Sequence, residues 1–192
     1  YGSILVLFTI LYMLTILLME KKDKEIYKGL SDTDALTGLF NRRAFQAAVD
    51  ETLLKRISGV FIFIDVDNFK DYNDKYGHAN GDLCLKHFAA AMKKCFPKDS
   101  ILGRYGGDEF VVYIKNAASD DAHRYMDEFQ REISHLIMSG GEHVTVSASA
   151  GGVAFIGGGE DFVSLCRSAD NMLYDVKRNG KGTFKIKGAK NM

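Results

Sequence analysis

The feature that most constrains this chain is a short apolar run near its middle. Residues Val60–Val66 read Val-Phe-Ile-Phe-Ile-Asp-Val, so only Asp65 interrupts the run. An apolar stretch of this length without polar alternation is typical of a central strand that is buried on both faces. We therefore expect a layered fold that contains at least one fully covered strand.

The rest of the chain supplies the other elements of such a fold. The apolar periodicity predicts helices at about 41–57, 68–76, 82–96, 119–138 and 160–178, and strands at 60–66, 101–104, 109–115, 143–150 and 183–187. A Gly-Gly turn joins the second and third of these strands and predicts a hairpin. This order of elements favours an α/β sandwich over a doubly wound parallel sheet.

The first 19 residues carry no charge and are dominated by large apolar side chains. A helix of this length reaches about 28 Å, close to the ~30 Å hydrocarbon thickness of a bilayer. A signal peptide would place basic residues before the apolar stretch, and a core helix would show a polar face. Here the lysines follow the stretch. The sequence thus predicts a transmembrane helix at 1–19, a connector helix at 20–31 and a cytoplasmic globular domain at 32–192.

Overall charge and cysteine usage exclude some functions. The 25 acidic and 25 basic residues balance, so bulk charge does not favour nucleic acid as a partner. Three cysteines (Cys84, Cys95 and Cys166) stand far apart among apolar residues, without a CxxC pair. We interpret them as buried structural thiols rather than a zinc site.

Two acidic pairs are the strongest sign of chemistry. Asp65 and Asp67 end the apolar strand, and Asp108 and Glu109 follow the glycines of the hairpin. For Asp67 we favour capping of the helix that follows, but Asp65 lies too far from that helix to cap it.

Neighbouring strands would bring Asp65 and Asp108 together around one or two Mg²⁺ ions, because hard cations prefer carboxylate oxygens. Such a site suits phosphoryl transfer. No GxxxxGK[ST], HExxH or GxSxG motif is present, and no GxGxxG follows a strand, so the usual P-loop, zinc-protease, hydrolase and dinucleotide sites are not predicted.

Four ordered blocks resemble the GGDEF family of diguanylate cyclases. Gly106–Phe110 spells the signature itself. The other blocks are Asp34–Arg43 (DALTGLFNRR), Asp65–Asp82, which includes DVDNFK, ND, GH and GD, and the closing stretch Ala169–Gly180. The resemblance implies a nucleotide-cyclase-like sandwich with a central mixed, mainly antiparallel five-stranded sheet flanked by helices.

The resemblance also implies roles for individual residues. Asp65, the carbonyl of Val66 and Asp108 would bind Mg²⁺ or Mn²⁺, and Asp108 would also accept the proton of the ribose 3′-hydroxyl. Lys70 would stabilise charge on the phosphate in the transition state. Glu109 is a further catalytic candidate, either as direct metal ligand or as support for one.

Other positions are expected to bind substrate. Asn73 and Asp82 would read the guanine edge, with Asn68, His78, Gly106 and Gly107 close to the nucleotide. Lys177 would contact the triphosphate. Lys181 stands where the family usually has arginine, which keeps the charge but loses the bidentate fork. Asp34, Arg42 and Arg43 are interpreted as structural charges at the domain entrance.

The implied reaction joins two GTP molecules into cyclic di-GMP and two pyrophosphates. One GTP per domain requires a homodimer, at the cytoplasmic face of a bacterial membrane, with a sensor region expected upstream in the full-length chain. The stretch Pro97–Ser100 lacks the Arg and Asp of the family's RxxD product-inhibition motif, so this inhibition is expected to be weak or absent. Three alternatives remain: a GTP- or cyclic di-GMP-binding module without catalysis, a cyclase for another or a mixed dinucleotide, and a membrane-tethered dimerisation element.

Overall fold

The computed structural model describes residues 9–19, 32–134, 136–137 and 143–188. The chain divides into two units, Tyr1–Asp32 and Thr33–Met192, each considered by itself.

In the first unit, residues 9–19 are helical and their large apolar side chains are exposed. Among the residues that the structure describes, no helix is both long and apolar enough to cross a membrane. The rest of the predicted span, residues 1–8, and the predicted connector at 20–31 lie outside the described residues.

The second unit is built on a sheet of six strands in the order β1-β3-β4-β2-β7-β8. The strands are β1 (Phe40–Asn41), β2 (Gly59–Val66), β3 (Ile101–Gly106), β4 (Glu109–Lys115), β7 (Ala148–Phe155) and β8 (Phe184–Lys187). The two outer pairs, β1 with β3 and β7 with β8, are parallel, and the inner pairs are antiparallel. The predicted mixed, mainly antiparallel sheet is confirmed.

The predicted number of five strands is wrong, because β1 adds a sixth. This strand has only two residues, too few for any alternating pattern to reveal it. The strand predicted at 143–150 is also displaced. The structure has β7 at Ala148–Phe155, and His143–Val144 (β6) pairs with Leu136–Ile137 (β5) in a separate small sheet.

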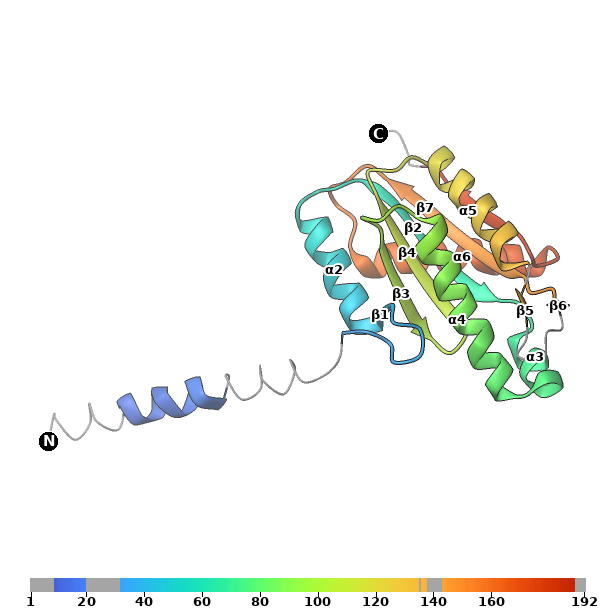
Figure 1. The fold of residues 1–192 in the computed structure, drawn as a ribbon. Coiled ribbons are helices and arrows are strands. Elements are labelled where there is room, and N and C mark those ends of the chain that lie inside the picture. The colour runs from blue at the N-terminus through green and yellow to red at the C-terminus, as the bar shows by residue number, and fades with distance from the viewer. Residues whose placement is uncertain (1–8, 20–31, 135, 138–142, 189–192) are drawn as a thin grey trace, which may run out of the picture. The chain divides into compact units, whose positions relative to one another are not determined.

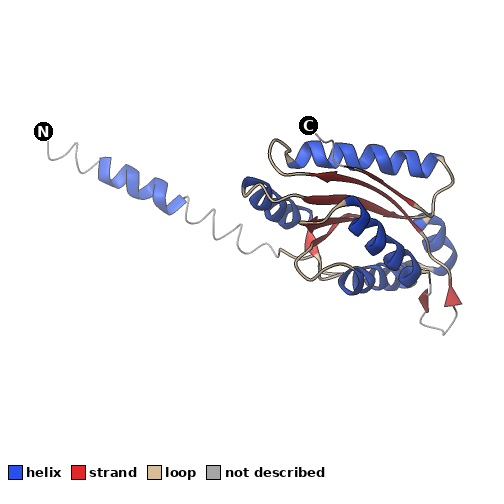
Figure 2. Cartoon of the chain, turned by 90° about the horizontal axis from the view of Figure 1, so that it is seen from above, coloured by secondary structure: helices blue, strands red, loops and turns tan. Residues whose placement is uncertain are grey.

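Helices cover both faces of the sheet, as the edge-on view shows (Figure 2). They are α2 (Arg42–Leu54), α3 (Phe69–Tyr76), α4 (His78–Cys95), α5 (Ser119–Ile133) and α6 (Phe162–Arg178). Alternate residues of β2 enter two separate cores. Ile62 and Ile64 pack with the core beneath α4 and α5, and Phe61 packs with the core beneath α2 and α6. Figure 1 labels these four helices on the ribbon. This double burial confirms the prediction made from the apolar run.

Glycines in β7 allow α6 to lie close to the sheet. A Cβ added at Gly151 would lie 2.1 Å from the backbone nitrogen of Leu173 and 2.3 Å from the carbonyl oxygen of Ala169. No side chain fits there, so α6 is held at a distance that only glycine permits. The carboxyl end of α6, with Lys177, is thereby fixed beside the end of β2.

Candidate active site

The two acidic pairs predicted to meet do lie together at one edge of the sheet. Asp65 is the penultimate residue of β2 and pairs with Glu109, the first residue of β4. The backbone N–H of Val66 donates to the carbonyl oxygen of Asp108 over 3.2 Å. The antiparallel pairing of β2 with β4 therefore brings Asp65, Asp108 and Glu109 to one place.

Burial and mutual repulsion disfavour negative charge at this edge. Burial raises the pKa of Asp65, and the charges of Asp108 and Asp67 raise it further against the opposing effect of Lys177. Burial likewise raises the pKa of Glu109, with Asp65 and Asp108 adding to the effect. A cation bound here would relieve this repulsion.

A lysine supplies part of that positive charge. The Nζ of Lys177, on α6, lies 2.8 Å from the Oδ2 of Asp65, and the two side chains are 36% and 14% exposed. Lys177, expected beside the triphosphate, thus contacts a predicted metal ligand directly.

The donor chemistry fits a hard divalent cation. Asp65 and Asp108 offer carboxylates and Val66 a carbonyl, all oxygen donors of the kind that Mg²⁺ and Mn²⁺ take. Within the described ranges, no group of three or more His, Cys, Asp or Glu side chains is arranged to hold a metal ion. The predicted metal ligands are the carboxylates of Asp65 and Asp108 and the carbonyl of Val66, with Glu109 either a further ligand or a support for one.

The signature turn is fixed by an arginine that the sequence did not mark as important. Arg104 donates two hydrogen bonds to the carbonyl oxygen of Gly107, over 2.9 and 2.7 Å, and its Nη1 reaches both carboxylate oxygens of Asp34. Burial acts to raise the pKa of Asp34, but hydrogen bonds from Thr37 and Arg104 outweigh it and lower the pKa overall. Asp34 is therefore a structural charge, as predicted, and it holds the turn through Arg104.

The predicted capping role of Asp67 is wrong. Helix α3 is preceded by Asn68, whose φ of +54° lies in the left-handed region, and no side chain caps the helix. The carboxylate of Asp67 instead accepts hydrogen bonds from the hydroxyls of Ser147 and Ser149 and from the N–H of Gly182. Proximity in sequence suggested a cap, whereas the actual partners are at least 80 residues away.

The predicted guanine-binding residues lie on two packed helices. Asn73 is on α3 and is half-buried, and Asp82 is on α4 and is exposed. The Oδ1 of Asn73 is buried and has no hydrogen-bond partner. A Cβ added at Gly81 would lie 1.8 Å from that oxygen. Glycine at 81 leaves the room that the Asn73 amide occupies, and the unpaired oxygen is suited to a donor from a ligand.

The remaining predicted residues have few contacts with the other predicted site residues. Lys181 donates to the Oδ1 of Asn68 over 2.7 Å. Gly106 and Gly107 are exposed in the hairpin turn, and Gly107 has a φ of +47°. Lys70 and His78 are exposed, and among the described residues neither has a hydrogen bond or ion pair to another predicted site residue.

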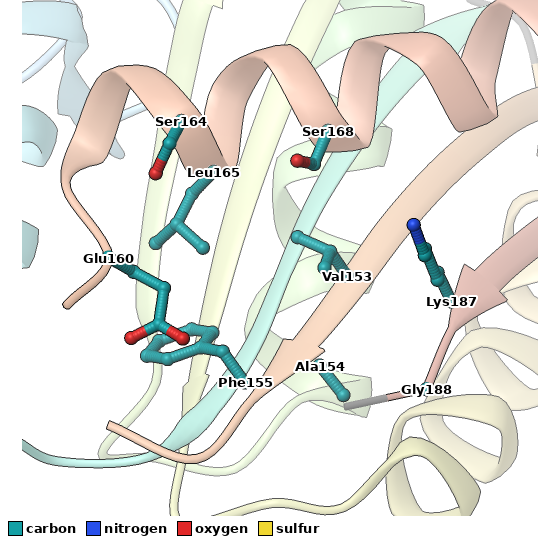
Figure 3. Close-up of a pocket in the computed structure, with 9 residues that line it drawn as sticks. All are labelled: Val153, Ala154, Phe155, Glu160, Ser164, Leu165, Ser168, Lys187 and Gly188. Carbon is teal, nitrogen blue, oxygen red and sulfur yellow. The ribbon is translucent and has the colours of Figure 1, made fainter. Parts of the chain in front are cut away.

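The cavities of the domain are shallow. One of about 260 Å³ borders the site and is lined by Asp67, Asn68, Tyr72 and Ser147 among others. Another, of about 280 Å³, lies between the first turns of α6 and the ends of β7 and β8 (Figure 3). It includes Glu160, Ser168 and Lys187 but none of the predicted site residues.

Comparison with known proteins identifies the family of the globular unit. The family description "Diguanylate cyclase, GGDEF domain" matches residues 31–183. The chain is 33% identical over 168 residues to the cyclic di-GMP phosphodiesterase PdeR of Escherichia coli K12, covering 86% of this chain and 25% of PdeR. It is 31% identical over 166 residues to the diguanylate cyclase DgcM of the same organism, covering 84% of this chain and 40% of DgcM.

A solved structure agrees. The GGDEF domain of TpbB, or YfiN, from Pseudomonas aeruginosa superposes with a TM-score of 0.75 at 30% identity, covering 80% of this chain and 93% of that one. The chain spans less than half the length of the two curated relatives described above. With the family match covering most of the globular unit and the signature residues gathered at one edge of the sheet, the chain belongs to the GGDEF family of diguanylate cyclase domains.

Proposed function

We propose that this chain is a diguanylate cyclase that joins two GTP molecules into cyclic di-GMP and two pyrophosphates. The observation that carries the proposal is the meeting of Asp65 with Asp108 and Glu109 at the ends of β2 and β4. The unpaired amide oxygen of Asn73 supports guanine as the base, because the guanine edge offers N–H donors.

In the proposed reaction, the 3′-hydroxyl oxygen of one GTP forms a bond to the α-phosphorus of the other. The bond from that phosphorus to the β-phosphate breaks, and pyrophosphate leaves with its electron pair. Asp108 takes the proton of the hydroxyl, and Lys177 and Lys70 balance negative charge on the phosphates. Mg²⁺ or Mn²⁺ bound by Asp65, the Val66 carbonyl and Asp108 would supply Lewis-acid stabilisation of the phosphate oxygens.

The reaction requires two copies of the domain. The residues above form one nucleotide site per chain, and cyclic di-GMP needs two reciprocal attacks. We therefore propose a homodimer in which two sites face each other. Activity per chain should rise with protein concentration until the dimer is saturated, and a concentration-independent rate for the monomer would contradict the dimer.

The test is identification of the product. The purified chain is incubated with GTP and Mg²⁺, and products are separated by chromatography and identified by mass. Asp108→Ala should lower the rate by roughly a hundredfold or more. Asp127→Ala, which removes an exposed carboxylate on α5, should leave the rate unchanged. If wild type and Asp127→Ala form cyclic di-GMP and pyrophosphate and Asp108→Ala does not, the result supports the proposed cyclase activity.

A binding module without catalysis is the second candidate. This chain matches a quarter of PdeR, which is named a cyclic di-GMP phosphodiesterase. A domain like this one therefore also occurs in a protein that is named for another activity. GTP binding by a verified dimer without any product would favour this candidate. A mixed dinucleotide as main product, from GTP with ATP, would favour the alternative synthase.

We also propose a membrane location, with the globular unit in the bacterial cytoplasm and a sensor region upstream. Its support is the charge-free sequence of residues 1–19 and the exposure of the apolar side chains at 10–19. The chain should sediment with lipid vesicles, and a version without residues 1–19 should stay in the supernatant. Equal sedimentation of the two proteins with vesicles would refute membrane binding by residues 1–19.

A further inference from the structure

Asp67 is a buried carboxylate whose three hydrogen-bond donors come from two distant parts of the chain. Its side chain is only 8% exposed. Oδ1 accepts from the hydroxyl of Ser149 over 2.6 Å, and Oδ2 accepts from the hydroxyl of Ser147 over 2.7 Å and from the N–H of Gly182 over 2.9 Å. A buried carboxylate that accepts from three donors is a strong local constraint. The N–H of Gly182 also contacts the Oγ of Ser149 over 3.2 Å, but its shorter bond is to the charged oxygen of Asp67.

The bond to Gly182 closes a ring that includes two predicted substrate-binding residues. Gly182 is covalently joined to Lys181, whose ammonium donates to the Oδ1 of Asn68 over 2.7 Å. Asn68 in turn follows Asp67 in the chain. The loop after α6 and the turn after β2 are thus tied together twice, once through Gly182 and once through Lys181.

The backbone of this ring has a conformation that must be held in place. Lys181 has a φ of +61°, in the left-handed region that is unfavourable for a residue with a Cβ. Gly182 follows with a φ of +63°. Without the bond from Gly182 to Asp67, the loop would lose an interaction that offsets this cost, and Lys181 would no longer be held over Asn68.

We propose that Asp67 is a positioning residue for nucleotide binding, which acts by holding the 180–182 loop so that Lys181 is aimed at the phosphates of GTP. The inference rests on the proposed function and assigns to Asp67 a role distinct from metal binding. The ammonium of Lys181 has three donors and uses one on Asn68, so donors remain for phosphate oxygens.

A double-mutant cycle separates this role from a general structural one. Binding of a GTP analogue that cannot be cleaved between the α- and β-phosphates is measured at equilibrium on the purified chain, together with KM and kcat. Asp67→Ala should weaken binding about tenfold and raise KM, with a smaller change in kcat. In the background of Lys181→Met, the same substitution should weaken binding less than twofold, because the lysine through which it acts is gone. A purely structural Asp67 predicts equal losses in both backgrounds.

Ser147→Ala is the matched control. It removes a hydrogen bond to the same Asp67 oxygen but leaves the bond from Gly182 intact, so binding should change less than twofold even if stability falls. A loss of binding as large as that of Asp67→Ala would overturn the proposal.

Asp67→Asn keeps one oxygen acceptor and is expected to weaken binding about threefold, again only while Lys181 is present. It takes the place of the alanine variant in the cycle if that variant does not fold. Wild-type chain that neither binds the analogue nor turns over GTP would overturn the proposed function itself. If wild type is active but the losses of analogue binding caused by the Asp67 and Lys181 substitutions are additive, only the proposed role of Asp67 is overturned.

Discussion

The ammonium of Lys177 lies 2.8 Å from the carboxylate of Asp65, so a residue expected to bind phosphate is paired with a residue expected to bind metal. The pair joins α6 to the end of β2. Because a lysine ammonium and a divalent cation compete for the same carboxylate, the pair must open, at least in part, when metal and triphosphate bind. Lys177 therefore offsets the charge of Asp65 in the ligand-free chain.

Removing this lysine should ease metal binding while impairing nucleotide binding. Lys177→Met is expected to bind Mn²⁺ alone about threefold more tightly, since a partly exposed ion pair is worth up to about 1 kcal/mol. The KM for GTP should rise about tenfold. Titration of Mn²⁺ without nucleotide measures the first effect and steady-state kinetics the second. Lys181→Met, which lacks a contact with Asp65, is the control and should leave Mn²⁺ affinity unchanged.

Asp65 and Glu109 should make the fold less stable as pH rises. The pKa values of Asp65 and Glu109 are raised above their ordinary values of 3.8 and 4.5, so the folded chain holds these protons more tightly than the unfolded chain. Stability is therefore lost as pH rises from the ordinary pKa through the raised one. Glu109→Gln should have a higher Tm than wild type near neutral pH and the same Tm at about pH 3–4. Thermal unfolding across pH measures this, and a lower Tm of the variant at neutral pH would contradict it.

The space beside Asn73 gives a test of guanine recognition. Gly81→Ala would by helix propensity alone stabilise α4 by about 1 kcal/mol. Its Cβ, however, would lie 1.8 Å from the Oδ1 of Asn73, so that flexible side chain must swing away. We expect a folded protein whose KM for GTP rises about tenfold and whose preference for GTP over ITP falls. Lys86→Ala, on the exposed side of the same helix, should change neither. Unchanged selectivity in Gly81→Ala would exclude Asn73 from base recognition.

The contacts of Arg104 with Gly107 and Asp34 should stabilise the fold at neutral pH more than at acid pH. Arg104→Met removes the bonds to Gly107 and leaves Asp34 without its cation, at an expected cost of about 1–3 kcal/mol at pH 7. The pKa of Asp34 is lowered in the fold, so its stabilising effect is present above the ordinary value of 3.8 and is lost as pH falls through the lowered one. The difference in the free energy of unfolding between Arg104→Met and wild type should thus become smaller below pH 4, and urea unfolding measures it. A constant difference would mean that Asp34 does not take part.

Product inhibition through the stretch before β3 should be weak. Pro97–Ser100 forms a turn in which the N–H of Ser100 donates to the carbonyl of Pro97, and Lys98 and Asp99 are exposed. Without an Arg at 97 and an Asp at 100, added cyclic di-GMP should give only a shallow decline of the initial rate. Tight non-competitive inhibition would contradict this expectation.

Several features follow from the sequence by itself. The apolar run predicts β2 as the central strand, and the glycines predict the hairpin that carries Asp108 and Glu109. The spaced motifs identify the family and most of the candidate site residues. The inferences about β2, the hairpin and the family succeed because burial of a strand, turn formation and motif spacing are recorded within a few neighbouring residues.

Other features are decided only by the tertiary structure. The partners of Asp67 lie 80, 82 and 115 residues away, and the partner of Arg104 lies 70 residues away. The two-residue strand β1 is defined by its neighbour β3 rather than by a pattern of its own. Hydrogen bonds and ion pairs of this kind depend on which segments pack side by side, and side-chain periodicity along one segment carries no record of that choice. The sequence therefore identified the family and predicted the candidate site residues, whereas long-range packing determined which residues hold them in place.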